Sequence, residues 1–292
     1  MSARHPIVGV TGSSGAGTST ALRVFADISA GLGLRPVIVE GDAFHALDRE
    51  QLRAAVERAR IRGENFSLFG PAGNLLQRLE AFLREYGEYG TGMLRRYLHT
   101  EAEAREAGQA PGTFTPWERL APGTDLLFYE GLHGGFVGDE VNIARHMDLL
   151  IGVVPVINLE WIQKVKRDTD ERGYRPEEVM KTILRRMPDY VNHITPQFSR
   201  TDINFQRVPL VDTSNPFMVR EIPTLEESLV VIHFNDHCRV SPDFDLLLRE
   251  IGGAYQSRPQ TLVVPGPMMG LAMELILKPA VEQLMLARAN AL

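Results

Sequence analysis

The sequence has 292 residues, of which 44% are hydrophobic and 23% charged, and its formal net charge is −6. This composition predicts a folded chain with a real core, and the acidic balance argues against a protein that binds nucleic acid through a broad basic face. The single cysteine, Cys238, excludes an internal disulfide, and without a signal-peptide pattern or roughly 18 consecutive apolar residues we expect a cytoplasmic protein with no membrane span.

Short apolar runs alternate with longer amphipathic stretches, the pattern of helices packed on a mostly parallel sheet. Strands are expected at residues 7–11, 37–40, 125–130, 149–154, 208–212, 228–234 and 261–264. Helices are expected at about 20–28, 49–62, 74–86 and 158–172, and from about 268 onward. We therefore expect one α/β domain, residues 1–292, with a mixed, mostly parallel central sheet flanked by helices. A polar segment at about 87–122 reads as an insertion that carries substrate contacts.

A glycine-rich stretch lies between the first expected strand and the first expected helix. It has the spacing of a P-loop, except that threonine replaces the usual lysine, and its residues are Gly12, Ser13, Ser14, Gly15, Ala16, Gly17, Thr18, Ser19 and Thr20. Glycines let backbone N–H groups converge on phosphate oxygens, and the helix N-terminus adds partial positive charge. We expect ATP to bind here, with Ser19 meeting Mg²⁺, although a glycine-rich turn without a ligand shares the pattern. Because Thr18 brings no charge, another cation must neutralise the β- and γ-phosphates.

Two acidic residues stand at the ends of expected strands. Asp42 directly follows the second strand, and ligands of such sheets gather at the carboxyl ends of strands. An aspartate there could take the proton of an attacking hydroxyl or could cap the next helix. Glu130 ends an apolar run, as does the acid that holds Mg²⁺ opposite a P-loop in kinases. The alternative is a hydrophobic strand whose last residue, Glu130, is simply exposed to solvent.

A basic run begins at Lys164 and includes Arg167 and Arg172. An exposed charged helix face explains such a run, but phosphoryl transfer needs several cations around the γ-phosphate, and these residues could supply them. Lys164 and Asp168 are four residues apart and therefore share one face of the expected helix.

Five longer strings together carry a family resemblance. They read GSSGAGTST at 12–20, EGDAFH at 40–45, FYEGLH at 128–133, VVPVINLEWIQK at 153–164 and TDINFQRVPLVDTSNPF at 201–217. In this order they resemble the shorter, bacterial form of the phosphoribulokinase family, which belongs to the P-loop kinases, and a threonine at the P-loop lysine position fits this branch. The resemblance implies ATP-dependent phosphorylation of D-ribulose 5-phosphate at its C1 hydroxyl, giving ribulose 1,5-bisphosphate and ADP, as in the Calvin cycle.

The resemblance also implies the catalytic roles. Asp42 would take the proton from the C1 hydroxyl, and Glu130 would help to hold the Mg²⁺ of Mg-ATP. Asp168 would be a further essential acid near the transferred phosphoryl group, and Lys164 would be the cation that stabilises its transition state.

Five more residues resemble substrate-binding groups of the family: His45, Arg49, His99, Arg167 and Arg172. Arg49 would hold the 5-phosphate, and the paired donors of arginine suit that task. His45 and Arg49 also follow Asp42 closely, as a basic pocket for a phosphorylated acceptor requires. The substrate-binding role of His99 rests on the resemblance, because the sequence of the loop around it does not by itself indicate a function.

This branch is typically oligomeric and activated by NADH, so we expect a homo-oligomer with NADH as a candidate effector. The effector role is in doubt because His233 stands where a basic residue is expected. Other P-loop kinases, of the uridine or pantothenate type, remain an alternative, and so does a non-catalytic nucleotide-binding regulator. A DNA-binding P-loop ATPase conflicts with the acidic charge.

Overall fold

The computed structural model describes residues 4–13, 17–170, 173–219 and 221–291. Within these residues, eight strands form one sheet in the order β2-β5-β1-β6-β7-β8-β10-β9. The parallel strands are β1 (Ile7–Thr11), β2 (Pro36–Glu40), β5 (Leu126–Gly131), β6 (Leu149–Val154) and β7 (Ile203–Pro209). The antiparallel strands are β8 (Ser228–Phe234), β9 (Tyr255–Arg258) and β10 (Thr261–Pro265). The expected α/β fold with a mixed, mostly parallel sheet is confirmed.

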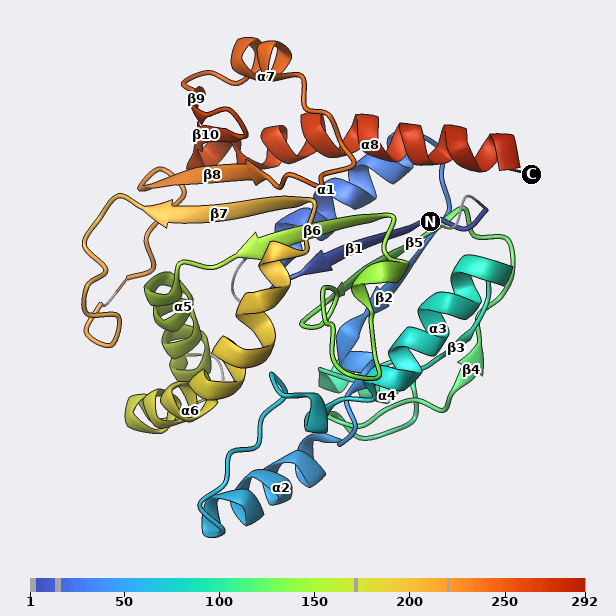
Figure 1. Ribbon diagram of the computed structural model, residues 1–292. Coiled ribbons are helices and arrows are strands. Elements are labelled where there is room, and N and C mark those ends of the chain that lie inside the picture. The colour runs from blue at the N-terminus through green and yellow to red at the C-terminus, as the bar shows by residue number, and fades with distance from the viewer. Residues whose placement is uncertain (1–3, 14–16, 171–172, 220, 292) are drawn as a thin grey trace.

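The central strands are continuous apolar runs because helices cover the sheet on both faces. All five residues of β1 are buried, and so are the first five of β6. On one face lie α1 (Thr18–Gly31) and α8 (Met269–Ala291), which pack against each other, and α3 (Leu76–Tyr89) lies on the other face (Figure 1). Each face therefore has its own apolar cluster, with Phe25 stacked on Phe128 in the first and Leu79 in the second.

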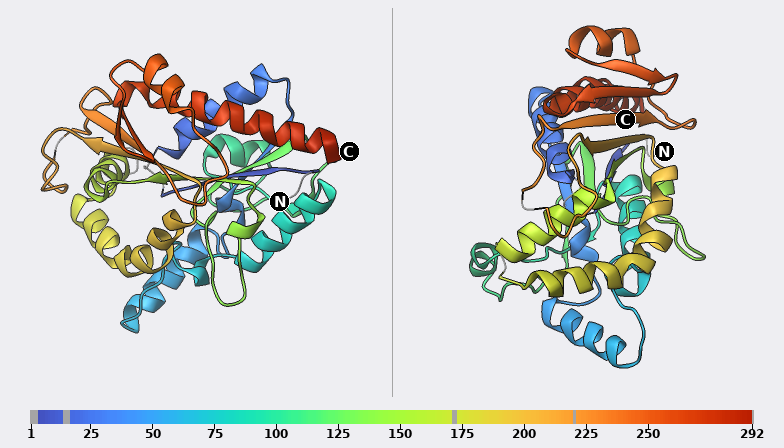
Figure 2. Two further views of the ribbon diagram at one scale, coloured as in Figure 1. Left: turned by 45° about the horizontal axis from the view of Figure 1, so that its top comes forward. Right: turned by 90° about the vertical axis from the view of Figure 1, so that its left-hand side faces the viewer.

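Several elements lie beyond the carboxyl ends of the parallel strands. They are α2 (Arg49–Ile61), α5 (Ile157–Asp170), α6 (Pro176–Asp189) and a π-helical turn at Tyr190–Ile194. Figure 2 shows α2 projecting at one end of the molecule and α7 (Phe244–Glu250) at the other. Short 3₁₀ turns occupy Gly41–Phe44, Pro71–Gly73, Ala144–His146, Thr195–Ser199 and Gly266–Met268.

The segment at 87–122 folds into its own small ladder. Strands β3 (Met93–Leu94) and β4 (Glu118–Arg119) pair antiparallel, and a bridge between Tyr97 and Phe114 continues the pairing. A short helix, α4 (Glu101–Glu106), follows a capping box and connects the two sides. The ladder contacts the residues after β2, since Arg49 N–H donates to the carbonyl of Gly112. The expectation of one domain over the whole chain stays a prediction.

The strand expected at 208–212 is wrong in position. β7 runs from Ile203 to Pro209, with Ile203 and Phe205 in the core and polar residues between them. Leu210 and Val211, which suggested a strand, are exposed after its end. Between these two core residues, Asn204 accepts from the Thr201 hydroxyl and donates to the carbonyl of Phe198.

Candidate active site

Two glycines at the described ends of the glycine-rich loop stand where a side chain would be unfavourable. Gly17 precedes α1 with a φ of 107°, a left-handed conformation that favours glycine. A Cβ on Gly12 would lie 2.7 Å from the carbonyl oxygen of Val153, so β1 and β6 approach too closely for a side chain there. Thr18 and Ser19 open α1. The predicted contacts of Ser14, Gly15 and Ala16 lie outside the described residues.

Glu130 stands at the end of β5, beside Thr18. Burial raises the pKa of the Glu130 carboxyl, the nearby carboxylates of Asp42 and Glu40 raise it further, and the Thr18 side chain opposes both effects. Glu40 is paired with Glu130 across β2 and β5, so the two carboxylates reach the same edge of the sheet. A cation would relieve the repulsion among these acids.

This acidic edge fits a Mg²⁺ that arrives with the nucleotide. Within the described ranges, no group of three or more His, Cys, Asp or Glu side chains is arranged to hold a metal ion. Glu130 and the Ser19 hydroxyl could therefore supply only part of the coordination shell. Mg²⁺ commonly takes its remaining ligands from substrate phosphates and water, which suits this donor set.

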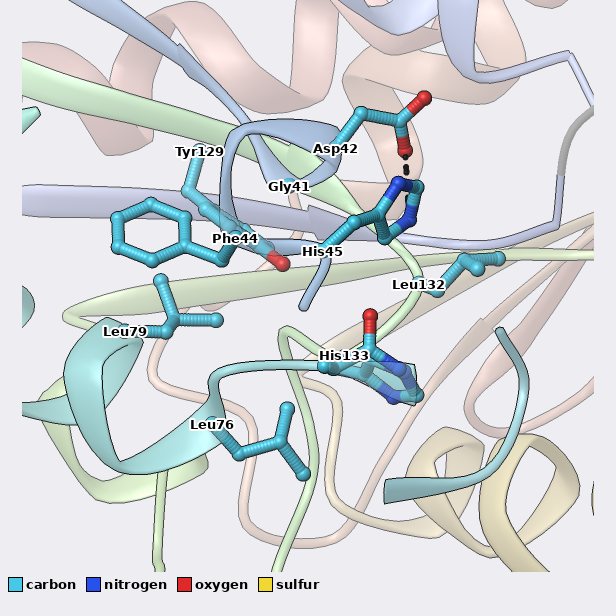
Figure 3. A pocket seen from close by; sticks show the side chains of 10 residues that line it. Gly41, Asp42, Phe44, His45, Leu76, Leu79, Tyr129, Leu132 and His133 are labelled. Atoms are coloured by element: carbon cyan, nitrogen blue, oxygen red, sulfur yellow. Dashed lines mark ion pairs between the residues drawn. The ribbon is translucent and has the colours of Figure 1, made fainter. Parts of the chain in front are cut away.

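Asp42 lies in the turn directly after β2, with its carboxylate between two imidazoles. Its Oδ1 is 3.3 Å from Nε2 of His45, and its Oδ2 is 3.6 Å from Nε2 of His99. Figure 3 shows Asp42 and His45 facing each other, with Phe44 and His133 in the same pocket. The Asp42 side chain is 37% exposed, so it is held on two sides and still open to a ligand.

The pKa values of the two histidines beside Asp42 are shifted in opposite directions. Burial lowers the pKa of His45, and only the Asp42 charge acts against it to a notable degree. The Glu40 carboxylate raises the pKa of His99, whose Nε2 is 3.7 Å from Glu40 Oε2, and the charges of Asp42 and Glu103 add to the effect. We infer a neutral His45 and a more easily charged His99.

Arg49 begins α2 immediately after the helix cap Asp48. Its guanidinium donates to the carbonyl of His99 at 3.0 Å, so it joins α2 to the 87–122 ladder. One turn later Arg53 donates to the Tyr174 hydroxyl at 3.4 Å. The guanidinium of Arg49 has five N–H donors, and its bond to the His99 carbonyl uses one of them. The other donors can form hydrogen bonds to a phosphate.

A second group of charges lies on α5 and α6. Lys164 Nζ is 2.5 Å from Asp168 Oδ2, which confirms that the two share a helix face, and Arg167 Nε is 3.5 Å from Asp168 Oδ1. Burial lowers the pKa of Lys164 and lowers that of Arg186 to about 10. The predicted Arg172 lies outside the described residues.

Glu160, a buried acid on α5, lies next to this second group of charges. Burial raises the pKa of the Glu160 carboxyl to about 7, against the opposing effect of the Ser13 and Tyr190 hydroxyls and the Lys164 charge. Glu160, Lys164, Arg186 and Tyr190 line one pocket. The buried acid of α5 and the basic residues of α5 and α6 therefore face a common space.

Sequence reasoning assigned no role to several residues that the structure brings to this edge: Glu40, Arg95, His133, Glu160, Arg186 and Tyr190. Two had a usable signal, since Glu40 ends a strand like Glu130 and Arg186 stands in a basic pair. The buried His133 had none, because its environment is formed by the carbonyl of Leu68, 65 residues away. Burial lowers the pKa of His133 to about 4, so it is neutral.

A family model described as Phosphoribulokinase / Uridine kinase family matches residues 7–214, well over half of the chain. The chain belongs to this family. "Phosphoribulokinase, plasmid" of Cupriavidus necator is 56% identical over 292 residues, covering 100% of this chain and 99% of the relative. "Phosphoribulokinase" of Rhizobium meliloti is 53% identical over 285 residues, covering 98% of each protein.

A solved structure, "Phosphoribulokinase from Rhodobacter spheroides", matches with a TM-score of 0.90 and 50% identity, and covers 98% of this chain and 99% of its own. The predicted family and enzyme class, a kinase of the phosphoribulokinase type, are confirmed. The similarity extends past residue 214, where the family model ends, so it includes the antiparallel strands and α8. No described helix is both long and apolar enough to cross a membrane.

Proposed function

We propose that this chain transfers the γ-phosphoryl group of Mg-ATP to the C1 hydroxyl of D-ribulose 5-phosphate, giving ribulose 1,5-bisphosphate and ADP. The observation that carries the proposal is Asp42, whose carboxylate is held by His45 and His99 beside the glycine-rich loop in a kinase of this family. Full-length relatives named phosphoribulokinase support the choice of substrate.

In this proposal Asp42 takes the proton of the C1 hydroxyl as the oxygen attacks. The neutral His45 and the more basic His99 restrict the carboxylate to one orientation, and a positioned base is effective when its geometry is set in advance. The exposed part of Asp42 supports this role, because a buried cap would have no access to the acceptor hydroxyl.

The basic residues of α5 replace the usual P-loop lysine. Charge spreads over the oxygens of the transferred group in the transition state, so Lys164 and Arg167 are well placed to stabilise it from α5. The contact between Lys164 and Asp168 supports this role, because it fixes the ammonium and offsets the cost of its burial. The same role, a cation near the transferred phosphoryl group, is proposed for Arg172.

Mg²⁺ would be held by Glu130 and Ser19 together with the nucleotide, and it would offset the negative charge of the β- and γ-phosphates when bound. Arg49 and His99 would hold the sugar phosphate. Arg49 contributes free guanidinium donors and His99 a raised pKa, both of which favour an anionic ligand. A nucleoside such as uridine carries no phosphate and would leave these charges unused.

A homo-oligomer in the cytoplasm and a response to NADH belong to the same proposal, and they rest on the family resemblance of the sequence. His233, the residue that puts the NADH response in doubt, contacts the Thr261 hydroxyl at 3.0 Å. Titrating NADH into the assay described next would test the response directly.

The test is ADP release by the purified chain with Mg-ATP and one acceptor at a time: ribulose 5-phosphate, ribose 5-phosphate, uridine or pantothenate. We expect turnover with ribulose 5-phosphate and at most background with the others. Turnover with uridine alone would agree with membership of the family but would contradict ribulose 5-phosphate as the substrate. ATP binding without turnover on any acceptor would favour a non-catalytic regulator instead.

A further inference from the structure

One extended segment of the 87–122 ladder supplies three side chains to the residues after β2. Arg95, Tyr97 and His99 are spaced by two, and in extended backbone alternate residues share a face. Backbone bonds between Arg96 and Thr115 and between Leu98 and Thr113 hold the segment extended. His99 contacts Asp42, and the rings of Tyr97 and His45 lie 6.0 Å apart.

Arg95 reaches the backbone on both sides of Phe44. Its Nε donates to the carbonyl of Ala43 at 2.8 Å, and its terminal nitrogen donates to the carbonyl of His45 at 2.6 Å. Ala43 and His45 are themselves buried, with 2% and 6% of their surface exposed. One guanidinium therefore holds the carbonyl groups of Ala43 and His45, on either side of Phe44, in the short segment that carries both Asp42 and His45.

Aromatic rings fix the guanidinium of Arg95 in turn. Its Cζ lies 3.6 Å from the ring centroid of Phe114 and 4.6 Å from that of Trp117. The Trp117 ring also packs against Phe44, at 5.7 Å between centroids. A planar, delocalised guanidinium stacks on such rings while two of its nitrogens each donate a hydrogen bond. A lysine ammonium has no planar face, and all its donors are on one nitrogen.

We propose that Arg95 is a positioning residue for the phosphoryl-transfer reaction, which sets the geometry of Asp42 and His45 by holding the 43–45 backbone against the insertion. The proposal rests on the proposed function of Asp42 and His45. Displacement of a catalytic group by about 1 Å can cost on the order of 10²-fold in rate, so the link matters although Arg95 touches no reacting atom.

Arg78 provides a matched control. Its Cζ lies 4.4 Å from the centroid of Trp117, so it stacks on the same ring as Arg95. In the described part of the chain no hydrogen bond joins Arg78 to Ala43 or His45, whose carbonyls accept from Arg95. Replacing Arg78 thus removes a charge and a stacking contact and leaves the backbone link intact.

The first measurement is steady-state kinetics of Arg95→Ala, Arg95→Lys and Arg78→Ala with Mg-ATP and ribulose 5-phosphate. We expect both Arg95 variants to lose roughly 10- to 100-fold in kcat, with the KM for ATP within about twofold of wild type, and Arg78→Ala to stay near wild type. Guanidinium at low millimolar concentration should restore part of the kcat of Arg95→Ala and none in Arg95→Lys. Equal losses in Arg95→Ala and Arg78→Ala, without rescue, would overturn the proposal.

Hydrogen–deuterium exchange of peptides spanning 41–46 tests the same link without turnover. Arg95→Ala should exchange faster there than wild type or Arg78→Ala, and guanidinium should slow it again. If the wild-type chain does not phosphorylate ribulose 5-phosphate, the proposed function fails, and faster exchange confined to 41–46 still supports Arg95 as the backbone anchor. Unchanged exchange in that segment, or equal acceleration throughout the chain, would count against the positioning role.

Discussion

Glu40 and His99 meet at the end of β2, with 3.7 Å between Glu40 Oε2 and His99 Nε2. The contact joins the last residue of a sheet strand to a side chain of the insertion, and it is the largest cause of the raised pKa of His99. Glu40 thereby favours a cation where the proposed sugar phosphate would bind, while Asp42 remains available as a base.

The first prediction concerns the pH dependence of substrate binding. Because the pKa of His99 is raised, its cationic form persists to higher pH, and the KM for ribulose 5-phosphate should increase as pH rises through that pKa. In Glu40→Gln the increase should begin at lower pH, since the main cause of the raised pKa is gone. The ionisation of the substrate is the same for both proteins, so the difference between their KM profiles isolates His99. Superimposable profiles would contradict the role of His99 as a phosphate-binding cation.

The second prediction concerns Asp42 as a base. Asp42→Asn should lower kcat by roughly 10²- to 10⁴-fold, because an amide cannot accept the hydroxyl proton. The Kd for ATP should stay nearly unchanged, as measured by calorimetry. Near-normal turnover of Asp42→Asn would remove Asp42 from this role.

The third prediction separates the two arginines on one face of α2. Arg49→Ala should raise the KM for ribulose 5-phosphate roughly 10- to 100-fold, the effect of losing a charge-assisted bond of about 1.5–3 kcal/mol. Arg53→Ala is the control, since Arg53 donates to the exposed Tyr174 hydroxyl at 3.4 Å and should change the KM far less. A KM that responds to neither variant would mean that the phosphate is held elsewhere.

The fourth prediction concerns the charge of Lys164. Burial lowers the pKa of Lys164 and the Asp168 carboxylate opposes that effect, so Asp168→Asn should lower the pKa further. The ammonium is then lost at lower pH, and the alkaline limb of the kcat–pH profile should move to lower pH. Asp170→Asn is the control, because Asp170 pairs with Lys166 on the more exposed side of α5. The same displacement in both variants would rule out a specific effect on Lys164.

The fifth prediction concerns stability far from the site. Asp202 is fully buried and accepts from Leu150 N–H and from Arg239, both at 2.8 Å. Asp202→Ala should lower the free energy of unfolding by about 3 kcal/mol, since it leaves donors without a partner in the core. Asp243→Ala, which removes only the N-terminal cap of α7, should cost about 1 kcal/mol. Urea denaturation measures the free energy of unfolding of both variants. Equal decreases would show that the buried contacts of Asp202 contribute no more to stability than a helix cap does.

Local patterns were sufficient to predict much of the sheet. The predicted bounds of β1 and β6 agree with the structure, because a strand buried on both faces needs consecutive apolar residues. The bounds of β8 agree too, although its residues are alternately buried and partly exposed. The missed helix α6 had a local signal too, with Pro176 in its first turn and Glu177 and Glu178 beside it. Where burial alternates with hydrogen-bonded polar residues, as in β7, the pattern alone misplaced the strand.

The sequence by itself determined the glycine-rich loop, the acids Asp42 and Glu130 at strand ends, and the pairing of Lys164 with Asp168, because each depends on residues within a few positions of one another. Only the tertiary structure decided that His99 and Arg95 meet Asp42 and His45. Those contacts connect residues about 50 or more positions apart, and their formation depends on how the insertion packs and on strand order, which no local pattern encodes.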